Sequence, residues 1–528
     1  MRPSPPDRAA RPGRSVRSRP AGPGGRWLPV VLGLGLSTVQ AQTADGAGAA
    51  RGWRIEPQVS VTETFTDNYR LVAQEPASDA VTRLTAGIGL RGQTGLLRGF
   101  LDYNLSSLLH ARHSQANTYQ NALNSALSAE LADGRLRLEA AAGISQNAIS
   151  AFGLQSGNSG LNAANTTEVR TLRLAPTLQG LLGPALRYNA SLAYQATDAS
   201  GSRNGDSATT TAAIHLEPQT AGRVGLALDA SHLASDFKAG RSTVSDRVFG
   251  TARYTINDLD LRLSANAGVE STDMASLRRQ RHGTWGIGWV WEPSPRTRLS
   301  GDWERRFFGT THALSLEHRT PLTVWRLSDS RSLNTSGGGA AGGVRGTAFD
   351  LFFSQFASIE PDPLKRADLV NAFLRSNGID PGLNLQPGFL RSSATVQDRQ
   401  EFSVAMRGVR SAAVLTASRS ATRRVDTSLS LGDDLDGGRV TLRLLALDLS
   451  HRLTPDSSVT LLLSRQQGGG NLANQTAQTT RQQSFNLGYT TRLGPTASLA
   501  LGLRRALYEN ASGAYDENAL FATYGLRF

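Results

Sequence analysis

Between Trp53 and Phe528, apolar residues alternate with small, polar or charged ones in runs of roughly eight to ten residues. A period of two places the two residue types on opposite faces of an extended strand. In residues 97–109, for example, Leu101 and Leu105 share one face, and Asp102 shares the other with Asn104. The pattern therefore predicts an all-β protein whose strands each have one apolar and one wet face.

The segments between these runs are alternately short and long. Ala132-Asp133-Gly134 and Leu493-Gly494-Pro495 are compact turn signals, whereas residues 148–166 and 467–482 are longer and polar. Short turns at one end and longer loops at the other are typical of outer-membrane barrels. We therefore predict a closed antiparallel transmembrane β-barrel of roughly 16 to 20 strands over residues 53–528. A secreted β-sandwich or β-solenoid also alternates, but charge on the second face of nearly every run favours the barrel.

The first 41 residues have the features of an export signal. Seven arginines precede an apolar segment, Trp27 to Leu36, that is too short to span a membrane as a helix. Val39 and Ala41 occupy the small-residue positions of a signal-peptidase site, so we expect cleavage after Ala41. Residues 42–52 then form a short mature segment before the barrel, and the expected location is the outer membrane of a Gram-negative bacterium.

The end of the chain resembles the signal that barrel-assembly machinery recognises. Apolar or aromatic residues stand at every second position up to a terminal aromatic one: Leu520, Ala522, Tyr524, Leu526 and Phe528. We take Tyr524, Leu526 and Phe528 as the assembly signal, with the assembly machinery and outer-membrane lipid as partners.

The alternation stops between residues 330 and 393. A glycine-rich stretch is followed by Asp362-Pro363, which opens a helix that ends before Gly378. The helix has one apolar side, made of Leu364, Ala367, Leu369, Val370, Phe373 and Leu374. We predict one helical insertion, which is either a plug folded into the lumen or a loop helix packed against the rim.

Composition limits the chemistry of the chain. It has no cysteine, which excludes disulfides and thiolate sites. The net charge is +13, but the first 41 residues hold seven arginines and one aspartate, which leaves an excess of only seven in the rest. Because that charge is interspersed with acidic residues, it does not indicate nucleic-acid binding. We find no phosphate loop, nucleotide fingerprint or metal-ligand spacing, and expect no cofactor, no metal and no enzymatic activity.

Charged residues on the wet face are candidates for the lumen wall. They alternate with apolar neighbours and include Arg98, Asp102, Arg137, Glu139, Arg187, Arg262 and Arg298. An electropositive channel for acidic glycans or other anions is one interpretation. A salt-bridged lumen that braces the wall is the other, and the pattern favours it.

Four stretches carry a family resemblance: residues 53–71 (WRIEPQVSVTETFTDNYRL), 121–153, 314–330 (LSLEHRTPLTVWRLSDS) and 373–420. They resemble the outer-membrane β-barrel proteins associated with the PEP-CTERM/exosortase system, which accompany exopolysaccharide biosynthesis. The resemblance implies a non-enzymatic component of exopolysaccharide export or surface display, with extracellular polysaccharide as a partner. It carries over no catalytic residue. A passive porin for small solutes and a barrel-embedded hydrolase are the alternatives.

Overall fold

The computed structural model describes most of the chain after residue 51. The described residues are 52–153, 165–202, 204–219, 222–337, 349, 352–353, 356, 360–376, 388–426, 434–471, 477–511 and 513–528. The predicted signal peptide of residues 1–41, with Val39 and Ala41, lies outside these ranges.

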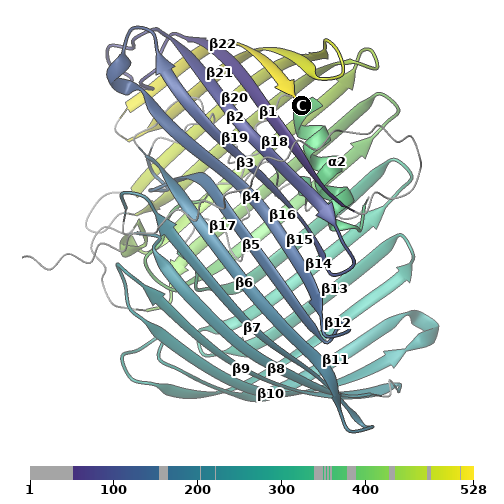
Figure 1. Cartoon of the computed structure of the whole chain (residues 1–528). Helices are drawn as coiled ribbons and strands as arrows, with labels where there is room; N and C mark the ends of the chain where they lie inside the picture. The colour runs from purple at the N-terminus through teal and green to yellow at the C-terminus, as the bar shows by residue number, and fades with distance from the viewer. Residues whose placement is uncertain are drawn as a thin grey trace, which may run out of the picture. The chain divides into compact units, whose positions relative to one another are not determined.

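The described chain forms one closed antiparallel β-barrel of 22 strands (Figure 1). Each strand pairs with the next one in sequence, and β22 pairs with β1, where Tyr524 is opposite Val61. The first strands are β1 Gly52–Thr66, β2 Asp79–Gln93, β3 Leu97–His110, β4 Thr118–Leu131, β5 Leu136–Ala148, β6 Thr166–Leu182, β7 Leu186–Ala199, β8 Ser207–Pro218, β9 Val224–Phe237, β10 Thr243–Ile256 and β11 Leu261–Thr272. The others are β12 Gln280–Ser294, β13 Thr297–Arg306, β14 Gly309–Arg319, β15 Thr323–Asn334, β16 Thr395–Arg407, β17 Ser411–Arg424, β18 Arg439–Arg452, β19 Ser457–Asn471, β20 Ala477–Arg492, β21 Ala497–Asn510 and β22 Gly513–Arg527.

The predicted fold class is confirmed, and the strand count exceeds the expected range. Polar strands such as β8, with the sequence SATTTAAIHLEP, lack the apolar alternation that identifies the others. The expected loop at residues 467–482 is also wrong, because β19 continues to Asn471 and β20 begins at Ala477. The outward positions become polar there while the backbone remains extended.

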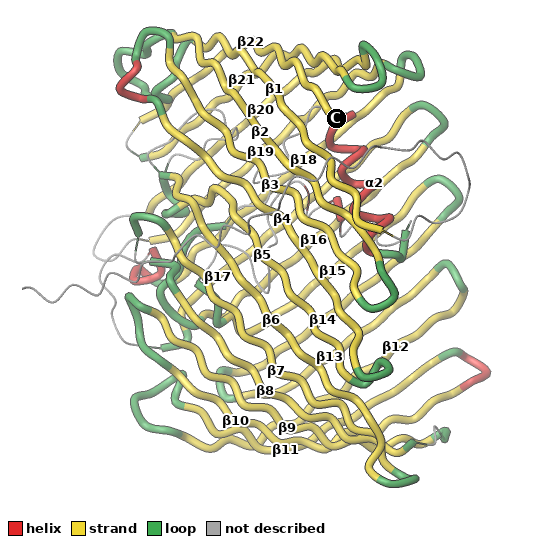
Figure 2. The backbone as a smooth tube through the Cα atoms, viewed as in Figure 1, coloured by secondary structure: helices red, strands yellow, loops and turns green. Residues whose placement is uncertain are grey.

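The two ends of the barrel differ in their connections (Figure 2). Even-numbered strands lead into the next strand through short turns such as residues 132–135, where Ala132, Asp133 and Gly134 have positive φ angles. Most connections at the other end are longer, and the longest, residues 335–394, joins β15 to β16. Strand β1 begins and β22 ends at the short-turn end. In outer-membrane barrels this end faces the periplasm.

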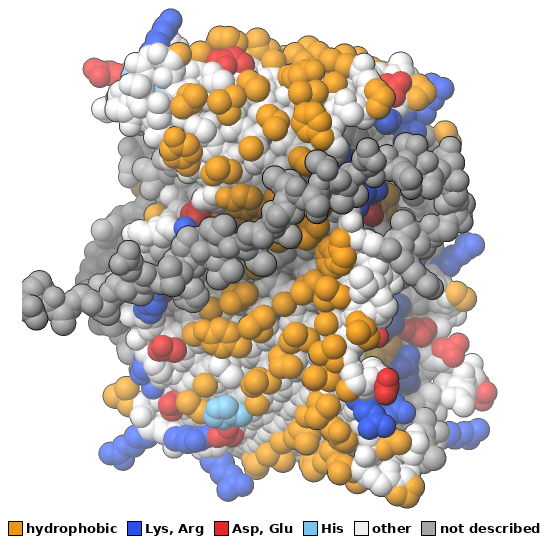
Figure 3. Space-filling view, viewed as in Figure 1, with side chains coloured by type: hydrophobic (Ala, Val, Ile, Leu, Met, Phe, Trp, Pro, Cys, Tyr) orange, Lys and Arg blue, Asp and Glu red, His pale blue; other side chains and the backbone are white. Residues whose placement is uncertain are grey.

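The outer wall is apolar over the part of each strand next to the short turns. On β21 the outward residues Leu499, Leu501 and Leu503 are followed by Arg505, and on β18 Leu449, Leu447 and Leu445 are followed by Arg443. Figure 3 shows hydrophobic side chains over the middle of one face and charged ones toward its two ends. We call this zone the apolar band. Outer-membrane barrels carry an outward apolar band of this kind where they cross the hydrocarbon layer.

Candidate functional site in the lumen

The insertion between β15 and β16 contains the predicted helix, α2 Pro363–Ser376. Asp362 caps it, because its carboxylate accepts a hydrogen bond from the Lys365 backbone N–H at 3.2 Å. Arg366 donates to the Glu360 carbonyl, and burial lowers the pKa of its guanidinium. Gly378, the predicted stop, lies outside the described residues.

Helix α2 lies inside the barrel, near the short-turn end (Figure 1). Ala367, Val370 and Leu374 are fully buried and form the predicted apolar side. They pack in one cluster with Phe100 of β3 and Val414 of β17, both on inward positions of the wall. Because α2 touches inward residues of strands on two parts of the circumference, it is a plug element and not a helix on the rim.

Aromatic side chains fill the space between α2 and the wall. The ring centroids of Phe352 and Phe373 are 4.7 Å apart, and those of Phe100 and Phe349 are 5.6 Å apart. Burying a large apolar side chain contributes about 1.5–3 kcal/mol. Apolar contact is therefore the main force that holds α2 against the wall.

One buried arginine links α2 to the wall electrostatically. Arg91 of β2 is only 7% exposed, and its guanidinium lies 2.9 Å from Asp102 and 3.1 Å from Asp368 of α2. It also lies 3.4 Å from Glu56, which in turn pairs with Arg527. Asn371 of α2 donates to Asp102 at 3.2 Å. We call Arg91 and the carboxylates around it the Arg91 node. Through Glu56 and Arg527 the node connects the first and last strands of the barrel to the insertion.

A second charged group follows the short-turn end of β7 to β15, which contribute no residue to the α2 cluster. Three inward glutamates there are each shared by two arginines. Arg187 and Arg253 flank Glu217, Arg262 and Arg298 flank Glu292, and Arg319 and Arg326 flank Glu317. We call these six arginines the arginine arc.

At the short-turn mouth the arginine arc has six arginines against three glutamates, and the next inward carboxylates on these strands, Asp229 and Asp302, lie deeper in the lumen. The six arginines are 28% to 62% exposed, so solvent reaches them. The short turns of the same strands carry Arg223 and Arg296 against Asp258 and Asp260, which leaves the excess unchanged. Rings of arginine favour anions in barrel lumens.

All seven predicted lumen charges face inward, and each has an ion-pair partner. Arg98 and Arg137 approach Glu130, Arg137 also pairs with Glu139 at 3.4 Å, and Asp102 holds Arg91. Arg187, Arg262 and Arg298 belong to the arc. The predicted bracing of the wall is therefore present, and the arc adds the electropositive character of the other interpretation.

Sequence reasoning missed the glutamates of the arc and the central role of Arg91. A local signal was available, since Glu292 and Arg298 flank one short turn and Glu317 and Arg326 flank another. An inward acid before a short turn and an inward arginine after it are brought together by the hairpin.

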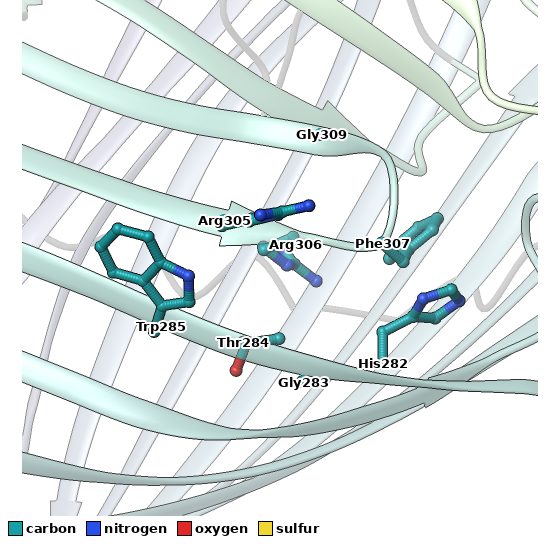
Figure 4. A pocket seen from close by; sticks show the side chains of 8 residues that line it. All are labelled: His282, Gly283, Thr284, Trp285, Arg305, Arg306, Phe307 and Gly309. Carbon is teal, nitrogen blue, oxygen red and sulfur yellow. The ribbon is translucent and has the colours of Figure 1, made fainter.

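An open cavity of about 530 Å³ lies at the long-loop end of β12 and β13 (Figure 4). His282, Thr284 and Phe307 line it beside Arg306. Arg306 already pairs with Glu270, whose side chain is fully buried. That pair therefore presents no free charge to a ligand, whereas Arg305, which also lines the cavity, makes no ion pair with any described residue.

Within the described ranges, no cluster of three or more His, Asp or Glu residues is arranged to hold a metal ion. No helix in the same ranges is long and apolar enough to cross a membrane.

No protein-family model and no curated protein matches the sequence. Among solved structures, the FrpB iron transporter of Neisseria meningitidis aligns over 91% of this chain and 82% of its own, at 10% identity and a TM-score of 0.46. OccK2 of Pseudomonas aeruginosa aligns over 90% and 98%, at 11% identity and a TM-score of 0.34. The closed 22-stranded barrel is established by the strand pairing itself.

Proposed function

We propose that the protein is a non-enzymatic outer-membrane barrel that passes an anionic polymer, an acidic exopolysaccharide, through a lumen obstructed by α2. We further propose that residues 1–41 are removed on export. The arginine arc is the observation that supports this function. Its two arginines per glutamate leave unneutralised positive charge at the mouth where a cargo from the periplasm would enter.

The identity of the polymer rests on the family resemblance. The Arg-Thr-Pro stretch begins at Arg319, so the segment 314–330 contains the complete triad of Glu317, Arg319 and Arg326. The segment 53–71 likewise contains Glu56, which pairs with Arg91. Two of the stretches that resemble exopolysaccharide-associated barrels thus supply lumen charge.

Planar-bilayer recording tests the proposal. Short oligogalacturonate, added on the short-turn side, is expected to block the ion current transiently, whereas maltodextrin of equal length is not. Arg187→Gln/Arg298→Gln should weaken the acidic block, because each substitution removes one positive charge from the arc. A steady current that acidic oligomers do not affect would refute passage of an acidic polymer. It would support the alternative of a passive porin for small solutes.

A further inference from the structure

Four exposed arginines form a row on the outer wall just beyond the apolar band. They are Arg419 of β17, Arg443 of β18, Arg465 of β19 and Arg505 of β21. On each strand the arginine follows the outward apolar residues of the band, as Arg465 follows Leu461 and Leu463. We call these four residues the outer arginine row.

The outer arginine row places like charges close together. Arg419 and Arg443 are directly opposite on neighbouring strands. Arg465 is opposite Leu445 and therefore diagonal to Arg443, at roughly 7–8 Å between backbones. Like charges in direct cross-strand positions destabilise a sheet. The arrangement therefore favours binding of a counter-charge from outside the chain.

The described part of the chain supplies no such counter-charge. Arg419, Arg443, Arg465 and Arg505 make no ion pair with any described residue. The carboxylate diagonal to Arg419 is Asp398, and Arg331 and Arg439 already share it at 3.5 Å each.

Some outward charges on other strands are neutralised within the chain. Arg170 pairs with Glu168 on β6, and Arg481 on β20 lies 3.6 Å from Glu509. Outward Arg281 of β12 and Arg305 of β13 also make no ion pair with a described residue, so the row is distinguished by the clustering of Arg419, Arg443 and Arg465 on three neighbouring strands.

We propose that the outer arginine row binds the phosphate groups of a phosphorylated glycolipid in the outer leaflet. The long-loop end is external in barrels of this type, so the row stands where the outer hydrocarbon boundary meets the headgroups. Arginine binds phosphate through paired N–H donors. The acyl chains would lie against the leucines below the row, among them Leu445, Leu463 and Leu503.

Thermal unfolding of the detergent-solubilised full chain tests the site with two lipids. Bisphosphorylated lipid A should raise the unfolding temperature at about tenfold lower concentration than the same lipid without phosphates. In Arg443→Gln/Arg465→Gln, the ratio of the two effective lipid concentrations should be close to one. Arg170→Gln, which removes an outward but paired arginine, should leave it unchanged.

Three results would overturn the proposal: equal potency of the two lipids on the wild-type barrel, an unchanged ratio in Arg443→Gln/Arg465→Gln, or the same shift with inorganic phosphate alone. The wild-type comparison is decisive even where the double variant fails to fold. The test does not involve the lumen, so its outcome is separate from that of the proposed cargo.

Discussion

Arg91 on the wall and Asp368 on α2 lie 3.1 Å apart, although 277 residues of sequence separate them. The contact lies at the part of the wall where β1, β2 and β22 meet. Arg91 also neutralises Glu56 and Asp102, so the wall and the plug depend on the same guanidinium.

Arg91→Gln should strongly destabilise the packing of α2 against the wall. It removes the shared cation from Glu56 and Asp102, and breaking a buried pair costs about 3–5 kcal/mol. We expect a larger and noisier bilayer current than that of the wild-type protein. A current identical to wild type would show that the node does not hold the plug.

Leu374→Ala and Asp368→Asn separate apolar from electrostatic attachment of α2. Leu374 is fully buried, and its truncation should cost about 2–5 kcal/mol. Asp368 is half exposed, so its ion pair contributes only about 0.2–1 kcal/mol. Bilayer recording should therefore show more frequent openings for Leu374→Ala than for Asp368→Asn. The reverse order would contradict the apolar account of the plug.

The sequence predicted the barrel, the start of α2 and the inward side of the charged positions, because each depends on local periodicity or capping. It left the place of α2 open. The same apolar side, with Val370 and Leu374, would suit a lumen or a rim. The choice depends on Phe100 and Val414, which are distant in sequence and meet α2 only once the barrel closes.

Leu501→Arg tests the apolar band. Leu501 is outward and near the middle of the band, where an arginine costs about 2–4 kcal/mol. Leu507→Arg is the matched control on the same strand, because Leu507 lies beyond the band between Arg505 and Glu509. Urea unfolding in lipid vesicles should show a lower free energy of unfolding for Leu501→Arg only. An equal decrease for both variants would show that Leu501 does not lie in the apolar band.

Deletion of Phe528 should impair assembly. Its backbone N–H donates to the Pro57 carbonyl at 3.0 Å, beside the β1–β22 seam, and its ring is exposed. Pulse-labelled cells should accumulate protein that lacks heat-modifiable migration in gels. Phe521→Leu, on the inward face of the same strand, serves as the control. Normal insertion of the deletion variant would remove the terminal residue from the assembly signal.

The insertion can be removed without opening the wall, because Asn334 of β15 pairs directly with Thr395 of β16. A barrel in which a short Gly-Ser linker replaces residues 338–388 isolates the arginine arc from α2. The reversal potential of this barrel in a KCl gradient is the most direct test of the account. We predict anion preference that Arg187→Glu/Arg298→Glu reverses; cation preference, or a value that the charge swap leaves unchanged, would contradict it.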